Sequence, residues 1–164
     1  MRYQLHDKLV SFGGGSIIQD TAGNDVYTVD TKGISLSKKL VFKDLQGNVL
    51  ADIQQKVFSF SATFEVVLSH GLSAKMTRKG SFGRDQLKIG VNGQDDMEAR
   101  GNFAQHDYTI FHSGRQVARV SKTLSVPGNG LGDPYGMEID DKEEQVLLLC
   151  SAVVIDAIHD LETD

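Results

Sequence analysis

A basic stretch near the middle of the chain carries side chains whose types and spacing suggest anion binding. The segment KMTRKGSFGRDQLK, residues 75–88, has one acid, Asp85, and five cations. The cations are Lys75, Arg78, Lys79, Arg84 and Lys88. With Phe82 as an exposed aromatic beside them, they could contact anionic lipid head groups, each contributing about 1 kcal/mol near the surface. The plainer interpretation, which the sequence favours, is a solvated hairpin whose alternating side chains point to water.

Residues for catalysis or metal binding lack a recognisable arrangement. The histidines, which form no HxH or HExxH motif, are His6, His70, His106, His112 and His159. The single cysteine, Cys150, allows neither an intramolecular disulfide nor a cysteine metal cluster. Gly13 to Gly15 lack the strand and helix context of a phosphate-binding loop. We therefore expect a protein that is not an enzyme, with no catalytic residue, no metal and no cofactor.

Charge is distributed unevenly along the chain. Residues 1–122 carry 16 Lys and Arg against 12 Asp and Glu, whereas residues 123–164 carry one base against 10 acids. A chain with a net charge of -5 and no aromatic stacking motif lacks the footprint of a nucleic-acid-binding protein. The N-terminal MRYQLHDKLV has no apolar region of the kind found in signal peptides. A cytoplasmic location is expected, with a peripheral position at the membrane as the alternative.

The elements that must position these residues are predicted to be β-hairpins. A short run of β-branched or aromatic residues, a glycine turn and a second short run recur along the chain, as in VFKDLQGNVLADI. The turn glycines are Gly23, Gly47, Gly71, Gly93 and Gly114, and Gly136 follows at the next interval. Their separations of 24, 24, 22, 21 and 22 residues suit two strands, a tight turn and a connection. About twelve antiparallel strands are expected.

An apolar segment near the C-terminus, VLLLCSAVVI from Val146 to Ile155, sets the architecture. It is too short to span a membrane, which takes about 20 apolar residues. Asp140 or Asp141 is a plausible N-cap for a helix over residues 142–160, and this helix is apolar on every side. We therefore predict one all-β domain, residues 1–164: a closed antiparallel barrel of about 12 strands around a buried C-terminal helix, with Cys150 buried and inert.

Asp156 directly follows the apolar segment, near the expected end of the helix. The helix dipole and partial burial both disfavour an anion there. We predict that Asp156 meets a Lys, an Arg or several backbone N–H groups from the barrel rim. The alternative is a carboxylate that reaches water past the rim.

Several segments together resemble the LURP-one-related family of the tubby C-terminal-like fold, particularly its small bacterial members. They are MRYQLHDKLVSFGGGSIIQDTAGNDVYTVD, LVFKDLQGNVLADIQQKVFSF, HDYTIFHSGRQVARVSKTLS, and DPYGMEI followed by VLLLCSAVVIDAI. The resemblance covers almost the whole chain and implies a barrel threaded by the C-terminal helix. Relatives on this fold bind phosphoinositide head groups in the tubby proteins and act at membranes in the phospholipid scramblases, but none of those branches supplies a motif that matches here residue by residue.

Residues and resemblance together favour a non-enzymatic binding or scaffold domain that uses its outer surface and loops to meet an unidentified protein partner. The alternative is a peripheral membrane protein that binds anionic phospholipid or phosphoinositide head groups. Neither hypothesis includes nucleic acid or a transmembrane segment.

Overall fold

The computed structural model describes residues 1–7, 16–32, 37–81, 84–125 and 133–163, which form twelve strands and two helices. The strands are β1 (Arg2–Asp7), β2 (Ser16–Asp20), β3 (Asp25–Thr31), β4 (Lys39–Asp44), β5 (Val49–Gln55), β6 (Thr63–Leu68), β7 (Ser73–Ser81), β8 (Arg84–Val91), β9 (Gln94–Asn102), β10 (Asp107–His112), β11 (Arg115–Ser121) and β12 (Asp133–Ile139). The helices are the 3-10 helix η1 (Lys122–Leu124) and α1 (Gln145–Thr163). Gly13 to Gly15 and Phe82 lie outside the described residues.

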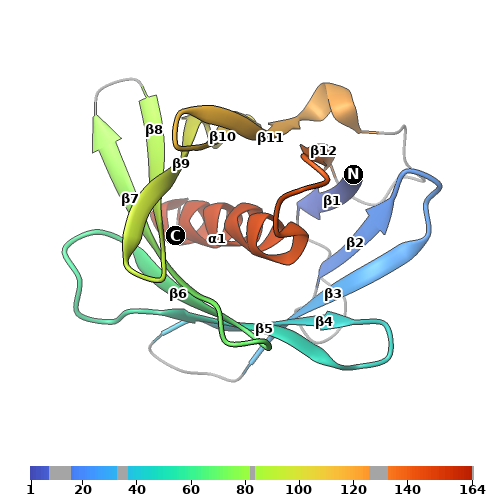
Figure 1. Cartoon of the computed structure of the whole chain (residues 1–164), viewed down its shortest axis with the longest axis horizontal. Coiled ribbons are helices and arrows are strands. Elements are labelled where there is room, and N and C mark those ends of the chain that lie inside the picture. The colour runs from blue at the N-terminus through green and yellow to red at the C-terminus, as the bar shows by residue number, and fades with distance from the viewer. Residues whose placement is uncertain (8–15, 33–36, 82–83, 126–132, 164) are drawn as a thin grey trace.

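The strands form a closed barrel. Each strand pairs antiparallel with its neighbours in the sequence, and β1 pairs with β12 to complete the ring. The closing register places Arg2 opposite Glu138 and Leu5 opposite Tyr135. Closure leaves no strand edge unpaired. Figure 1 shows α1 running through the middle of the ring, so the predicted barrel around a C-terminal helix is confirmed.

Five tight turns lie together at one opening of the barrel. They contain Gly23, Gly47, Gly71, Gly93 and Gly114, all with φ between 81° and 98°. Because successive strands run in opposite directions, every second connection lies at the same end, which explains the regular interval between these glycines. We call this opening, where α1 begins, the helix-start mouth. The opposite opening, where α1 ends, is the helix-end mouth.

Two of the tight turns share the motif D-x-x-G-N. The side chain of Asp20 accepts the backbone N–H of Asn24 at 2.9 Å, and Asp44 accepts that of Asn48 at 2.9 Å. The pKa of the Asp20 carboxyl is lowered, mainly by the Asn24 N–H, and that of Asp44 is lowered, mainly by the Asn48 side-chain amide. The aspartate fixes the turn while the glycine supplies the positive φ that it needs.

Gly136 follows at the same interval but is a strand residue rather than a turn residue. It lies in β12 opposite Gln4 of β1. A Cβ atom at this position would overlap the main chain of Leu124 in η1. Glycine is therefore required here so that η1 can pack against the strand.

The apolar segment of α1 is buried, as predicted. Its residues with 0% exposure are Leu148, Leu149, Cys150, Ser151, Ala152 and Val154. Val146 and Val153 are partly buried. Burial raises the pKa of the Cys150 thiol and keeps it protonated. Within the described parts of the chain, no helix has the length and apolar character needed to cross a membrane.

The helix lies three residues later at each end than the predicted range of 142–160. Asp140 forms a turn before the helix, in which its carboxylate accepts the backbone N–H of Lys142 at 3.1 Å. The carbonyl of Glu144 accepts the first helical hydrogen bond at 3.2 Å. Glu144 therefore holds the N-cap position, and the predicted cap at Asp140 or Asp141 is wrong.

Candidate binding surface

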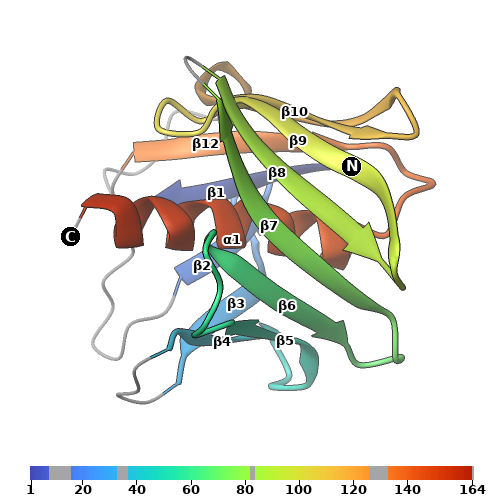
Figure 2. The same cartoon turned by 90° about the vertical axis from the view of Figure 1, so that its left-hand side faces the viewer.

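Strands β7 and β8 present four of the five predicted cations to solvent. Side chains alternate between the two sides of a strand, and Ala74 and Met76 face the core. The outward-facing cations, which we call the basic face, are Lys75, Lys79, Arg84 and Lys88. Lys88 lies opposite Thr77, so Lys75 and Lys79 are its diagonal neighbours at roughly 7–8 Å. In Figure 2 the two strands cross in front of α1.

The cations of the basic face form no close ion pair in the described structure, although Glu65 lies opposite Lys75 and Glu98 lies opposite Lys88 in the neighbouring strands. Among the residues that the structure describes, these four side chains have no ion-pair partner within 4.0 Å. The acids on the neighbouring strands are held by other cations: Glu65 pairs with Lys56 at 3.1 Å, and Glu98 pairs with Arg100 at 3.2 Å. Lys79, opposite Gln86, and Arg84, opposite Ser81, are therefore the cations of this face that are most available to an anion from outside the chain.

Arg78, the fifth predicted cation, lies on the other side of β7. Its guanidinium pairs with Asp85 at 2.6 Å and with Glu162 of α1 at 3.3 Å. It also lies over the Phe103 ring, 5.4 Å from the ring centroid. Only 19% of the side chain is exposed. Strand alternation from Met76 was the signal that could have separated Arg78 from the basic face.

The connection between β5 and β6, residues 56–62, carries two aromatic rings that are fully exposed. Phe58 has a relative accessibility of 102% and Phe60 one of 112%. We call this connection the aromatic loop. It lies beside β7, because the carbonyl of Ala62 accepts the backbone N–H of Arg78 at 2.9 Å. Sequence analysis did not single out these rings, although F-S-F in a gap between two predicted strands was visible.

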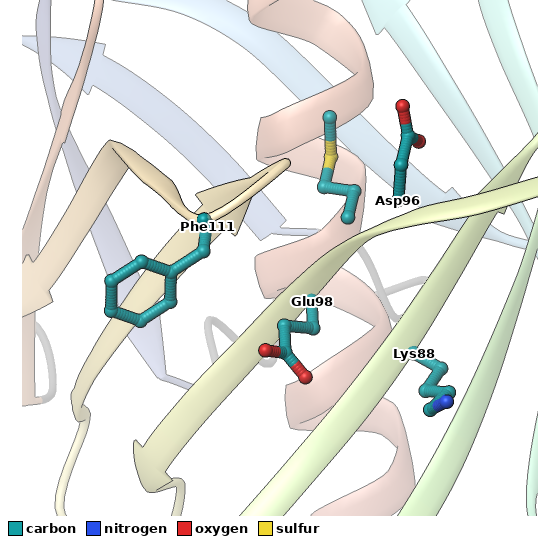
Figure 3. A pocket seen from close by; sticks show the side chains of 6 residues that line it. Lys88, Asp96, Glu98 and Phe111 are labelled. Atoms are coloured by element: carbon teal, nitrogen blue, oxygen red, sulfur yellow. The ribbon is translucent and has the colours of Figure 1, made fainter.

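A surface pocket of about 160 Å³ lies outside β8, β9 and β10. Its lining residues are Lys88, Asp96, Met97, Glu98, Phe111 and Gly114. Figure 3 labels four of these side chains, with Glu98 in front of the helix, Phe111 on one side of it and Asp96 and Lys88 on the other. One face of the Phe111 ring is taken by Arg100, 4.4 Å from the centroid. Lys88 belongs to both the pocket and the basic face, so the two features form one continuous surface.

The pocket contains a carboxylate that contacts histidine. Asp96 lies 3.1 Å from Nε2 of His112. The other ring nitrogen of His112 is 3.5 Å from Glu143. The Asp96 and His112 pair therefore links β9 to the segment before α1.

Acids before α1 form ion pairs with cations at the helix-start mouth. Arg115 pairs with Asp140 and with Glu143, each at 2.9 Å. The N-terminal ammonium pairs with Asp141 at 2.5 Å. The pKa of Asp140 is lowered, mainly by the Lys142 N–H and then by the hydrogen bond from Arg115. These contacts hold the start of the helix against the barrel.

Asp156 is paired, as predicted, but with partners of another kind. The Tyr135 hydroxyl donates a hydrogen bond to its carboxylate at 2.5 Å, and Nδ1 of His106 is 3.6 Å away. The His106 ring stacks on Tyr135 with centroids 4.0 Å apart. Asp156 is 24% exposed. Two of its partners are thus a phenol and an imidazole, neither of which is the Lys, Arg or backbone N–H group that was predicted.

The histidines take part in local structural contacts. His6 lies 3.1 Å from the Gln19 side chain, and His70 lies 3.5 Å from Glu144. In the described part of the chain, no group of three or more His, Cys, Asp or Glu side chains could hold a metal ion.

Comparison with known proteins gives one family and two relatives. The family model described as LURP-one-related matches residues 1–156. The chain is similar to the "Uncharacterized protein YxjI" of Bacillus subtilis (strain 168), with 23% identity over 155 residues, 94% of this chain and 91% of that protein. It is also similar to the X-ray structure of the Arabidopsis thaliana protein AT5G01750, with a TM-score of 0.65 and 14% identity, covering 97% of this chain and 91% of the other. The structural likeness shows a shared fold.

Proposed function

This chain belongs to the LURP-one-related family, and from that premise we propose that it is a non-enzymatic binding or scaffold domain acting through its outer surface and loops. The observation that carries the proposal is the filled interior of the barrel. Leu148, Leu149 and Cys150 of α1 are completely buried among inward-facing strand residues. Since protein interiors are packed as densely as organic crystals, the partner has to be recognised from outside.

The basic face is the proposed recognition surface, and the proposed partner is acidic. Its four cations lie on two adjacent strands, whose backbones hold them at fixed spacing. Charges held in this way and left unpaired attract a partner of opposite sign.

A paired set of variants tests this surface. Lys79→Ala/Lys88→Ala removes two charges from the basic face, and Lys122→Ala/Lys142→Ala removes two exposed charges elsewhere. In a pull-down from the native cell, the first variant is expected to lose the partner that wild type captures, whereas the second retains it. Equal capture by both variants would contradict the proposed surface.

A second candidate function is peripheral binding to an anionic membrane. The observation that favours it is the aromatic loop beside the basic face, because two exposed phenylalanines next to unpaired cations suit the membrane interface. Each cation near an anionic lipid surface contributes about 1 kcal/mol.

Vesicle co-sedimentation measures this binding. Two cations at about 1 kcal/mol each predict a roughly 30-fold weaker partition of Lys79→Ala/Lys88→Ala onto phosphatidylserine vesicles. Binding should also weaken as salt is added, because salt screens exposed charges. Wild-type protein that stays in the supernatant with anionic vesicles at low salt would exclude the membrane candidate.

A further inference from the structure

The aromatic side chains of the aromatic loop are more exposed than the other phenylalanines with described side chains. Of the other phenylalanines with described side chains, Phe42, Phe64 and Phe103 are buried, and Phe111 lies under Arg100. Phe58 and Phe60 have no such cover, and Val57 beside them is 50% exposed. Large apolar side chains left exposed close together in one loop mark a candidate interaction site.

Hydrogen bonds within the loop fix the course of its backbone, and so the positions from which the two rings project. The N–H of Lys56 donates to the carbonyl of Thr63 at 2.8 Å, which closes the base of the loop. The hydroxyl of Ser59, between the two rings, donates to the carbonyl of Ser61 at 2.7 Å. Figure 1 shows the connection between β5 and β6 projecting from the barrel on the side where the C-terminus lies.

Cations flank the loop on both sides. On one side the carbonyl of Lys38 accepts the N–H of Gln55 at 2.9 Å, which places Lys38 and the exposed Lys39 beside its base. On the other side Lys79 of the basic face follows directly after Arg78, which bonds to the loop. The segment KVFSFSA itself contains one base and no acid.

Three acids with described side chains near this mouth have cation partners. Asp160 lies 3.6 Å from Lys38, and Glu162 and Asp85 both pair with Arg78. Lys39 and Lys79, which form no ion pair in the described structure, leave positive charge beside the apolar tip. This combination matches an anionic lipid surface, where the head groups contact the cations and the acyl boundary accepts the rings.

We propose that Phe58 and Phe60 insert into the interfacial region of an anionic membrane, with the helix-end mouth turned toward the lipid. This inference rests on the membrane candidate described above and adds the inserting residues and the orientation. The helix-start mouth, where Arg115 pairs with Asp140 and Glu143, then faces away from the membrane.

Tryptophan reporters test the insertion, since the chain contains no Trp. Phe58→Trp places a reporter in the aromatic loop. Leu45→Trp places one at a 53% exposed position in the β4–β5 turn at the helix-start mouth. With phosphatidylserine vesicles, the emission of Phe58→Trp is expected to shift to the blue and to be quenched by brominated lipid. The emission of Leu45→Trp should stay unchanged.

A loss-of-function variant complements the reporters. Phe58→Ala/Phe60→Ala removes two fully exposed rings and should leave the unfolding transition unchanged, while its partition onto the vesicles falls about tenfold or more. Undiminished partition of this variant would overturn the proposal.

The outcomes separate the inference from the function on which it rests. If the protein co-sediments with the vesicles but the emission of Phe58→Trp does not change, membrane binding stands and insertion is wrong. If the protein does not co-sediment at all, both are wrong. If gel filtration shows a wild-type dimer that Phe58→Ala/Phe60→Ala dissociates, a second copy of the chain covers the loop instead and the proposal is overturned.

Discussion

At the scale of single residues, Asp156 is the acid whose burial has the clearest energetic consequence. Its carboxylate lies within the barrel, accepts the Tyr135 hydroxyl at 2.5 Å and lies 3.6 Å from His106. Asp156→Ala removes this acceptor from a mostly buried site. We expect the free energy of unfolding to fall by about 2 kcal/mol or more, measured by urea denaturation.

Glu162→Ala is the matched control for Asp156. Glu162 also lies on α1 and also has a partner, Arg78, but half of its side chain is exposed. An exposed pair is worth about 0–1 kcal/mol, so this variant should lose correspondingly little. Equal stability of Asp156→Ala and wild type would show that the carboxylate contributes nothing to holding the helix.

Removal of the Tyr108 hydroxyl is expected to maintain or raise the stability, in contrast to Asp156→Ala. Its hydroxyl is buried and has no hydrogen-bond partner among the described residues. Burial and then the charge of Asp156 raise the pKa of this phenol well above its usual value, so it stays neutral. Tyr108→Phe removes a desolvated hydroxyl that has no compensating hydrogen bond. The free energy of unfolding should therefore stay the same or rise by about 1 kcal/mol at most, with a thermal midpoint that is unchanged or higher.

Tyr3→Phe provides the comparison for Tyr108. The Tyr3 hydroxyl donates to the Gln145 side chain at 3.1 Å, so its removal should cost about 0.5–1.5 kcal/mol. A loss of that size in Tyr108→Phe would mean that its hydroxyl has a partner after all.

At the scale of the elements, glycine serves two different purposes in this barrel. In the tight turns, such as that of Gly47 with φ of 86°, it supplies a backbone conformation, and no atom lies within 4 Å of a would-be Cβ. In β12, Gly136 supplies space for η1. Both roles produce a glycine at nearly the same interval, and the chain alone does not distinguish them.

Alanine at three glycines separates the two roles. Gly136→Ala forces a methyl group against the Leu124 main chain and should cost about 1–3 kcal/mol or more in urea denaturation. Gly47→Ala places a side chain at positive φ and should cost about 1–2 kcal/mol. Gly80→Ala meets only the end of the Arg78 side chain at 3.9 Å and should stay within about 0.5 kcal/mol of wild type. A neutral Gly136→Ala would show that η1 can move away from β12 at little cost.

At the scale of the whole molecule, folding pairs the acidic C-terminal part with cations from the rest of the chain. Arg2 pairs with Glu138, Arg115 with Asp140 and Arg78 with Glu162. The charge asymmetry along the sequence is therefore largely neutralised within the barrel. The four cations of the basic face form no ion pair in the described structure and lie together on two adjacent strands, which is why they are the strongest candidates for contact with an anionic partner.

The sequence by itself determined the number of strands, their hairpin order and the closed barrel, because these follow from local rules. Period-two alternation predicts strands, positive-φ glycines predict turns, and an apolar segment with no polar face has to be enclosed. The resemblance to the LURP-one-related family implied the same architecture, and the match to the family model confirms the resemblance.

Tertiary structure alone decided which side chains meet. Strand alternation predicts that Arg78 faces inward, but only the structure shows that its partner is Glu162, 84 residues away. Likewise, only the structure brings Asp156 to Tyr135 on β12 and to His106 in the connection between β9 and β10. The exposure of Phe58 and Phe60 likewise depends on how far their loop projects from its neighbours. Such contacts are set by strand register and by the position of α1 along the barrel axis, which no local pattern in the chain encodes.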